Sequence, residues 1–263
     1  MLKKRLIPVL FLKEGNLVRS QSFTIHQYIG DPISHVKRMM DWNVDELIII
    51  DIDPEEFSFQ KQRNDHKSKP INTMTDFTKL ISEELRIPLA LGGKIRSLDD
   101  IKLRIQNGAD KVIINYLLSY NHTIVEKAVE AFGSQAIVAS VDYKVIDNEA
   151  IVFTDHGKNN KNLKLLDWTL FAEKCGVGEL FLNCIDRDGT AKGFDLENID
   201  KISKALNIPV IACGGAGSYD HFLDCFLKTE ASAVAAGNIF HFKENFYPIS
   251  KNFLLEKINS VRP

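Results

Sequence analysis

Eight short apolar segments recur along this chain, and their number constrains the fold more than any other feature. Between most of them the apolar residues follow helical spacing, as Ile33, Val36 and Met40 do. Alternation of short strands with helices is typical of a parallel sheet covered by helices, and eight such units predict a closed α/β barrel of the (β/α)8, or TIM, type. The predicted strands are residues 6–12, 47–52, 87–91, 112–114, 136–141, 180–184, 208–213 and 233–236.

An internal repeat supports closure into a barrel. The sequence PLALGG at residues 88–93 returns as PVIACGG at residues 209–215, about half a chain later. Repetition at half length predicts two half-barrels of four units each, whereas an open sheet with one glycine-rich turn would not explain the second copy. The repeat extends to Ser97 and Asp99, which recur as Ser218 and Asp220, and to strands that end at Asn115 and Asn238.

Composition limits the domain organisation and the partners. The chain has 263 residues, 44% of them hydrophobic, and no linker-like segment divides it, so we expect a single domain over residues 1–263 with a long polar loop at about 54–73. A net charge of −2 argues against a nucleic-acid polymer as partner. Only a short apolar run follows the charged start, too little for a membrane span, so we expect a cytoplasmic protein. The four cysteines are widely spaced, which indicates neither a zinc ribbon nor a disulfide framework, and we expect no metal or cofactor.

Glycine pairs follow the third and seventh predicted strands, where a barrel can bind phosphate through backbone N–H groups. The seventh strand leads into Gly214, Gly215, Ala216 and Gly217, and the eighth ends in Gly237 and Asn238. After the third strand a lysine, Lys94, follows Gly92 and Gly93, and its ammonium could pair with an anion. Tight turns alone could also require these glycines, so both interpretations stay open.

Carboxylates gather at the ends of several predicted strands. They are Asp51 and Asp53 after the second strand, Asp142 after the fifth, and Asp186 and Asp188 after the sixth. Because the C-terminal ends of barrel strands face the site, such a carboxylate can act as general acid or base. We assign this role to Asp142 and Asp188. The alternatives are helix capping for Asp142 and a local Asx turn for Asp186 and Asp188.

Four charged residues stand directly before apolar runs at the opposite ends of the strands: Arg5, Glu46, Lys111 and Glu179. Two positive and two negative charges would therefore meet at the barrel floor. Buried charges are costly to desolvate and add little net stability, which favours a role beyond stability. Spacing alone favours a plug that closes the base of the barrel.

Several sequence segments together resemble the cyclase subunit family of imidazole glycerol phosphate synthase over nearly the whole chain. The resemblance implies that a glutaminase subunit docks at the barrel floor and delivers ammonia. It places the gate of an ammonia channel on Arg5, Glu46, Lys111 and Glu179, and the glutaminase-docking residue on Asp110. The segments are MLKKR at 1–5, GDP at 30–32, DEL at 45–47, GADK at 108–111, FGSQA at 132–136, IDRDGT at 185–190, GGAG at 214–217 and FHF at 240–242.

The sequence departs from that family at the predicted top of the barrel. The resemblance implies an acid–base pair of aspartates at the ends of the first and fifth strands, but Phe11 stands at the first position while Asp142 keeps the second. Arg19 and Lys94 replace a lysine and a glycine, and Tyr116 replaces a threonine. The resemblance further implies a ligand or phosphate set consisting of Arg19, Gly93, Lys94, Asn115, Gly189, Gly215, Ala216, Gly217, Gly237 and Asn238.

These departures beside an intact set of floor charges favour a paralogue that receives ammonia but serves another substrate. Residues 6–13 (LIPVLFLK), 18–21 (VRSQ) and 26–27 (HQ) resemble the glycosyl amidation-associated branch linked to bacterial surface polysaccharides. That resemblance implies a separate ATP-dependent sugar amidotransferase as further partner, a phosphorylated or nucleotide-linked substrate, and conversion of an acetamido to an acetamidino group. Two alternatives remain: an authentic imidazole glycerol phosphate synthase cyclase, and a non-catalytic scaffold that conducts ammonia and activates the glutaminase.

Overall fold

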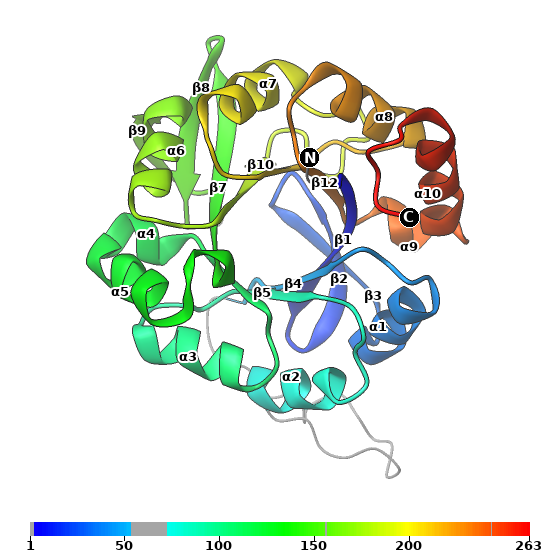
Figure 1. Cartoon of the computed structure of the whole chain (residues 1–263), viewed down its shortest axis with the longest axis horizontal. Coiled ribbons are helices and arrows are strands. Elements are labelled where there is room, and N and C mark those ends of the chain that lie inside the picture. The colour runs from blue at the N-terminus through cyan, green and yellow to red at the C-terminus, as the bar shows by residue number, and fades with distance from the viewer. Residues whose placement is uncertain (1–2, 54–72, 156, 243) are drawn as a thin grey trace.

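A computed structural model describes residues 3–53, 73–155, 157–242 and 244–263, and its centre is a closed barrel of eight parallel strands (Figure 1). Each strand pairs with the next in chain order, and the last pairs with the first, which closes the sheet. The predicted (β/α)8 fold is therefore confirmed. The barrel strands are β1 (Arg5–Lys13), β4 (Leu47–Asp51), β5 (Leu89–Gly92), β6 (Lys111–Ile114), β7 (Ile137–Ile146), β10 (Glu179–Cys184), β11 (Val210–Cys213) and β12 (Ala233–Ala236).

Helices surround the barrel on its outside, as Figure 1 shows. All eight predicted strands are present, although Ile87 and Ile208 precede their strands and Ala136 ends a 3-10 turn (Ser134–Ala136) before β7. The helices are α1 (Pro32–Asp41), α2 (Met74–Ser82), α3 (Leu98–Gln106), α4 (Tyr116–Tyr120), α5 (His122–Phe132), α6 (Leu165–Lys174), α7 (Leu196–Ala205), α8 (Tyr219–Lys228), α9 (Ile239–Phe242) and α10 (Phe246–Lys257). None of the helices within the described ranges is long and apolar enough to cross a membrane.

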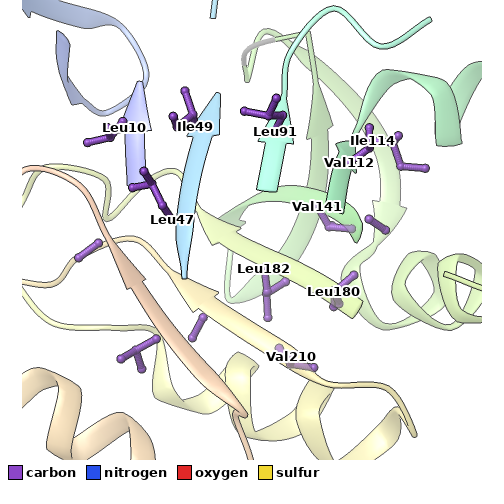
Figure 2. Packing of buried hydrophobic residues seen from close by; sticks show 14 of the residues in the cluster. Leu10, Leu47, Ile49, Leu91, Val112, Ile114, Val141, Leu180, Leu182 and Val210 are labelled. Atoms are coloured by element: carbon purple, nitrogen blue, oxygen red, sulfur yellow. The ribbon is translucent and has the colours of Figure 1, made fainter. Parts of the chain in front are cut away.

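Alternating side chains of the strands divide the core into two clusters. In β1, Leu6 and Leu10 belong to the larger cluster between the sheet and the helices, part of which Figure 2 shows. Ile7 and Phe11 belong to the smaller cluster inside the barrel. Each fully buried side chain of this size contributes roughly 1.5–3 kcal/mol relative to an exposed one, so both clusters hold the strand ends in fixed positions.

Two antiparallel hairpins, which the sequence analysis did not predict, leave the barrel at equivalent places. The strands β2 (Asn16–Gln21) and β3 (Ile25–Gly30) follow β1, and β8 (Glu149–Thr154) and β9 (Asn159–Lys164) follow β7. At the tip between β7 and β8, Asp147 and Asn148 both have positive φ, +49° and +64°. Two positive φ angles in sequence match the primed turns that two-residue hairpins favour.

The half-barrel repeat is visible in the backbone. Ser97 caps the N-terminus of α3 and Ser218 caps that of α8. A Cβ atom on Gly93 would lie 2.1 Å from the carbonyl oxygen of Asp51, and one on Gly214 would lie 2.4 Å from that of Cys184. Both halves therefore bring a glycine into direct contact with the preceding strand.

The polar segment predicted as a long loop at about 54–73 lies outside the described residues except for Thr73. That threonine caps α2, since its hydroxyl accepts a hydrogen bond of 3.1 Å from the backbone N–H of Asp76. A single domain over residues 1–263 stays a prediction.

Candidate active site

A cavity of about 330 Å³ opens at the C-terminal ends of the barrel strands. Its walls combine apolar side chains from inside the barrel with carboxylates and amides from the strand ends, the composition expected of a small-molecule site. The residues that line it are Phe11, Phe23, Ile50, Asp51, Ile52, Asp53, Gly92, Gly93, Lys94, Ile95, Arg96, Ile113, Asn115, Tyr116, Ser140, Asp142, Asp155, Phe181 and Asn183.

Asp142 on β7 is one of three buried carboxylates that line this cavity, with 7% of its surface exposed; the others are Asp51 and Asp53. The side-chain amides of Asn115 and Asn183 each donate a 2.9 Å hydrogen bond to it. Burial raises the pKa of Asp142 to about 6, with the two amides opposing the rise and the charge of Asp188 adding to it. A carboxyl group with such a pKa can both take up and release a proton near neutral pH.

Phe11 occupies the position in β1 that Asp142 occupies in β7. Each is the first residue of its strand to pair with the following hairpin, Phe11 with Val18 and Asp142 with Phe153. The ring of Phe11 is buried and meets the ring of Phe23 edge-on, with 6.2 Å between the ring centroids. An aromatic contact therefore stands where the second half-barrel has the carboxyl group of Asp142.

Asp188 does not line the cavity but holds the hairpin that follows β1. Its carboxylate accepts hydrogen bonds from the Ser20 hydroxyl at 2.7 Å and from the backbone N–H of Phe23 at 3.2 Å. Burial raises the pKa of Asp188. Asp186 makes a similar contact where β7 leads into the other hairpin, because its carboxylate accepts a hydrogen bond of 2.7 Å from the backbone N–H of Val145 on β7. In the structure both carboxylates position the hairpins, and the catalytic role assigned to Asp188 stays a prediction.

Lys94 forms an ion pair with Asp51 inside the cavity, with 2.9 Å between Nζ and Oδ2. Burial raises the pKa of Asp51, and the ammonium of Lys94 opposes this rise. Lys94 has a φ of +58°, a conformation that favours glycine, and its repeat partner Gly215 has a φ of +97°. The predicted anion-binding lysine therefore already contacts a carboxylate, while Gly93 and Asn115 line the same cavity as predicted ligand residues.

The second predicted anion site, around Gly215, Ala216 and Gly217, lies outside the lining of this cavity. The backbone N–H of Gly217 donates a hydrogen bond of 3.1 Å to Nδ1 of His221. A side chain therefore caps one of the amides that were predicted to bind an anion. A Cβ atom on Gly215 would lie 2.1 Å from the carbonyl oxygen of Gly193. Close packing of the loop explains this glycine without a ligand, and anion binding here stays a prediction.

The remaining predicted ligand residues surround the hairpin after β1. The side-chain amide of Asn238 donates a hydrogen bond of 2.6 Å to the carbonyl oxygen of Ser20. A Cβ atom on Gly189 would lie 2.6 Å from that same oxygen. A Cβ atom on Gly237 would lie 3.7 Å from the ring of Phe11. The Arg19 guanidinium lies 5.2 Å from the ring centroid of Phe242 and does not line the cavity.

The four predicted floor charges form one closed ring of ion pairs. Arg5 contacts both Glu46 and Glu179, and Lys111 contacts the same two carboxylates at 2.8 and 2.7 Å. The side chains are between 2% and 20% exposed. Three of the four residues begin barrel strands and Glu46 directly precedes β4, so the ring lies at the opposite end of the barrel from the cavity.

Asp110, the predicted docking residue, is exposed beside this ring. Its carboxylate accepts a hydrogen bond of 2.8 Å from the backbone N–H of Leu89, and its own N–H donates one of 2.9 Å to the carbonyl oxygen of Leu89. These contacts tie β5 to β6 at the floor, and a docking role is an additional prediction that they do not test.

Several cavity residues were not singled out from the sequence, among them Asn183 and Phe23. Asn183 holds Asp142, and its signal was a polar residue inside an otherwise apolar strand segment. Phe23 closes over Phe11, but it lies at a hairpin tip that the sequence analysis did not recognise.

Comparison with known proteins agrees with this architecture. The sequence model of the family described as "Histidine biosynthesis protein" matches residues 5–245. This chain belongs to that family, in its HisF branch. A relative from Hydrogenobaculum sp. (strain Y04AAS1) is 39% identical over 263 residues, the full length of both chains. A relative from Sulfolobus acidocaldarius is 41% identical over 241 residues, 92% of this chain and 91% of its own. Both are named "Imidazole glycerol phosphate synthase subunit HisF".

Proposed function

We propose that this chain is the synthase subunit of a glutamine amidotransferase complex, and that it joins ammonia to a phosphorylated substrate in the cavity around Asp142. The observation that carries the proposal is that the floor ring and the Asp142 carboxyl group lie at opposite ends of the same barrel. Glu179 of the floor ring begins β10, and Asn183, which holds Asp142, is near the end of that strand. A glutaminase at the floor would thus release ammonia on the axis that leads to the cavity.

The names of the relatives favour imidazole glycerol phosphate synthesis as the reaction. They support the alternative of an authentic cyclase better than they support sugar amidation, the main prediction from the sequence. In this reaction Asp142 would take a proton from the attacking nitrogen and return it to a leaving oxygen, since its pKa of about 6 suits both steps. Asn115 and Asn183 would hold the carboxyl group in place throughout.

Sugar amidation remains the second candidate because of Phe11 and Lys94. Phe11 cannot transfer a proton, and loss of one acid–base group typically costs about 10²- to 10⁴-fold in rate. Lys94 pairs with Asp51 where the resemblance implies a glycine that would leave room for phosphate. Both features change the cavity and leave the floor ring complete, as a change of substrate would.

Binding to a glutaminase tests the proposal. We expect the purified chain to bind a glutaminase subunit co-expressed with it and to raise glutamine hydrolysis, and Asp110→Lys should weaken the complex. Asp110→Asn is the matched control, because its side-chain oxygen can still accept the hydrogen bond from Leu89. Asp142→Asn should leave docking intact, since Asp142 lies at the other end of the barrel. Absence of both binding and stimulation would refute the proposal.

Excess free ammonium with the aminoimidazole-carboxamide ribonucleotide precursor separates the candidate reactions, because it bypasses the glutaminase. Cyclised product supports imidazole glycerol phosphate synthesis. Its absence, with glutaminase stimulation intact, favours sugar amidation or a non-catalytic scaffold. The variant Phe11→Asp measures the contribution of the missing acid–base group: we expect little recovery if the ion pair of Lys94 with Asp51 also excludes the substrate.

A further inference from the structure

Two exposed tyrosines and an arginine form a row at the mouth of the cavity. The rings of Tyr116 and Tyr120 stack, with 5.3 Å between centroids and 17° between planes, and the guanidinium of Arg96 lies 5.9 Å from the Tyr116 centroid. Tyr116 is 46% exposed and Tyr120 is 74% exposed. Because Arg96 and Tyr116 also line the cavity, the row is continuous with the candidate active site.

Fold stability does not require this row. The two tyrosines are four residues apart on α4, so helical spacing places the rings together, but mutual contacts of this kind add only a few tenths of a kcal/mol. The buried residues of α4 are Leu117 and Leu118, which anchor the helix instead. Large aromatic side chains left in water beside a cavity are typical of ligand contacts.

The spacing suits a flat ring. A planar ligand between the guanidinium and Tyr116 would need about 7 Å, two contacts of roughly 3.5 Å each. The present separation of 5.9 Å falls short by about an ångström, and Arg96 is exposed on a long side chain that can move by that amount. Arginine and tyrosine both stack on aromatic heterocycles, arginine through its cation as well.

The charges of the cavity fix which part of a ligand would lie at this rim. Asp51, Asp53 and Asp142 line the interior, and Asp51 already pairs with Lys94. Carboxylates accept hydrogen bonds from hydroxyl and amino groups and repel phosphate. A phosphorylated ligand would therefore direct hydroxyl or amino groups inward and keep its phosphate away from the carboxylates, with Arg96 as a cation at the entrance.

We propose that Arg96, Tyr116 and Tyr120 form a stacking subsite for the planar nitrogen heterocycle of a ribonucleotide at the rim of the cavity. This subsite adds binding residues to the proposed synthase and rests on that function only in taking the cavity as the reaction site. The heterocycle has two possible sources: the ring of a simple ribonucleotide, or the base of a nucleotide-linked sugar.

Calorimetric titration with three ligands tests this subsite. The probes are adenosine 5′-monophosphate, uridine diphosphate N-acetylglucosamine and ribose 5-phosphate, which has no heterocycle. Stacking on an aromatic side chain contributes roughly 1–3 kcal/mol per base, so Tyr116→Ala should weaken nucleotide binding about 5- to 150-fold. Binding of ribose 5-phosphate should stay within about twofold of wild type, because that ligand cannot stack.

Two variants control the measurement. Tyr116→Phe keeps the ring and should bind nucleotides within about twofold of wild type, whereas Tyr28→Ala removes a similarly exposed tyrosine from β3, away from this row. Loss confined to adenosine monophosphate supports a simple ribonucleotide, and loss for the uridine ligand supports a nucleotide sugar. Equal losses of affinity for the nucleotides and for ribose 5-phosphate, or no nucleotide binding at all, would overturn the subsite. Glutamine hydrolysis reports on the floor independently, so failure here leaves the proposed function standing.

Discussion

Replacing Asp142 by asparagine should change how the stability of this protein depends on pH. The folded carboxyl has a pKa of about 6, raised by burial, compared with 3.8 for an ordinary aspartate. Folding therefore retains a proton that the unfolded chain releases, and the folded state loses stability as pH rises through the window between these two values. The wild type carries nearly all of this loss by about pH 7, and the asparagine variant does not carry it at all.

The size of the effect follows from the two pKa values. A difference from 3.8 to about 6 corresponds to roughly 3 kcal/mol when the carboxyl is fully ionised, of which about 1.3 kcal/mol develops between pH 5 and pH 7. Asparagine has one oxygen where Asn115 and Asn183 donate to two, so the variant leaves one donor facing an amide nitrogen. That mismatch costs about 1–3 kcal/mol at every pH, which makes the pH dependence more informative than the absolute stability.

Urea unfolding at pH 5, 6 and 7 measures this difference. The free energy of unfolding of the wild type should fall relative to that of Asp142→Asn by about 1.3 kcal/mol from pH 5 to pH 7. Asp155→Asn is the matched control: it removes an exposed carboxylate of the same cavity but keeps Asp142, so it should retain the wild-type fall. Parallel curves for wild type and Asp142→Asn would refute the reasoning.

Two further substitutions test the floor and the turn after β5 by urea unfolding. Lys111→Met leaves two buried carboxylates with one cation and should lower the free energy of unfolding by on the order of 3–5 kcal/mol. Its control, Lys164→Met, breaks an exposed ion pair and should lower it by at most about 1 kcal/mol. Equal losses of stability would contradict a buried ring. Gly93→Ala should lower the free energy of unfolding by several kcal/mol more than Gly193→Ala. Both glycines have φ near +95°, so the backbone strain is similar. The new Cβ atom would lie 2.1 Å from a backbone oxygen in the first variant but 3.6 Å from a side chain in the second.

The barrel could be predicted from the sequence because its strands are short, fully buried and separated by helical periodicity. The half-barrel repeat was also readable, since PLALGG and PVIACGG preserve the glycines that touch the preceding strand. The two hairpins were missed because their strands are partly or wholly exposed, as the six exposed residues of β9 illustrate, and carry little hydrophobic pattern. The available signal in the sequence was the pair Asp147 and Asn148, residue types that tolerate the positive φ angles they adopt here.

The placement of side chains could be predicted where one residue per strand decides the geometry, while their roles stay predictions. The ring of floor charges followed from four charged residues beside strand starts, and Asp142 from its place near a strand end. Contacts between distant segments could not be predicted. The bond from Ser20 to Asp188 joins a hairpin to a loop far along the chain, and the Lys94–Asp51 pair depends on a left-handed backbone that sequence patterns do not report.

The duplicated turns give this barrel unusual freedom to evolve. The two half-barrels carry two copies of one backbone turn, and substitutions can affect each copy separately. At the left-handed position after Gly93 and Gly214, one copy has Lys94 with its ion pair to Asp51 and the other has Gly215. The two turns make separate contacts, since a Cβ atom on Gly93 would meet Asp51 whereas one on Gly214 would meet Cys184, and a substitution in one turn need not disturb the other. A lineage can therefore explore new ligands with one half of the molecule while the other half preserves the inherited scaffold.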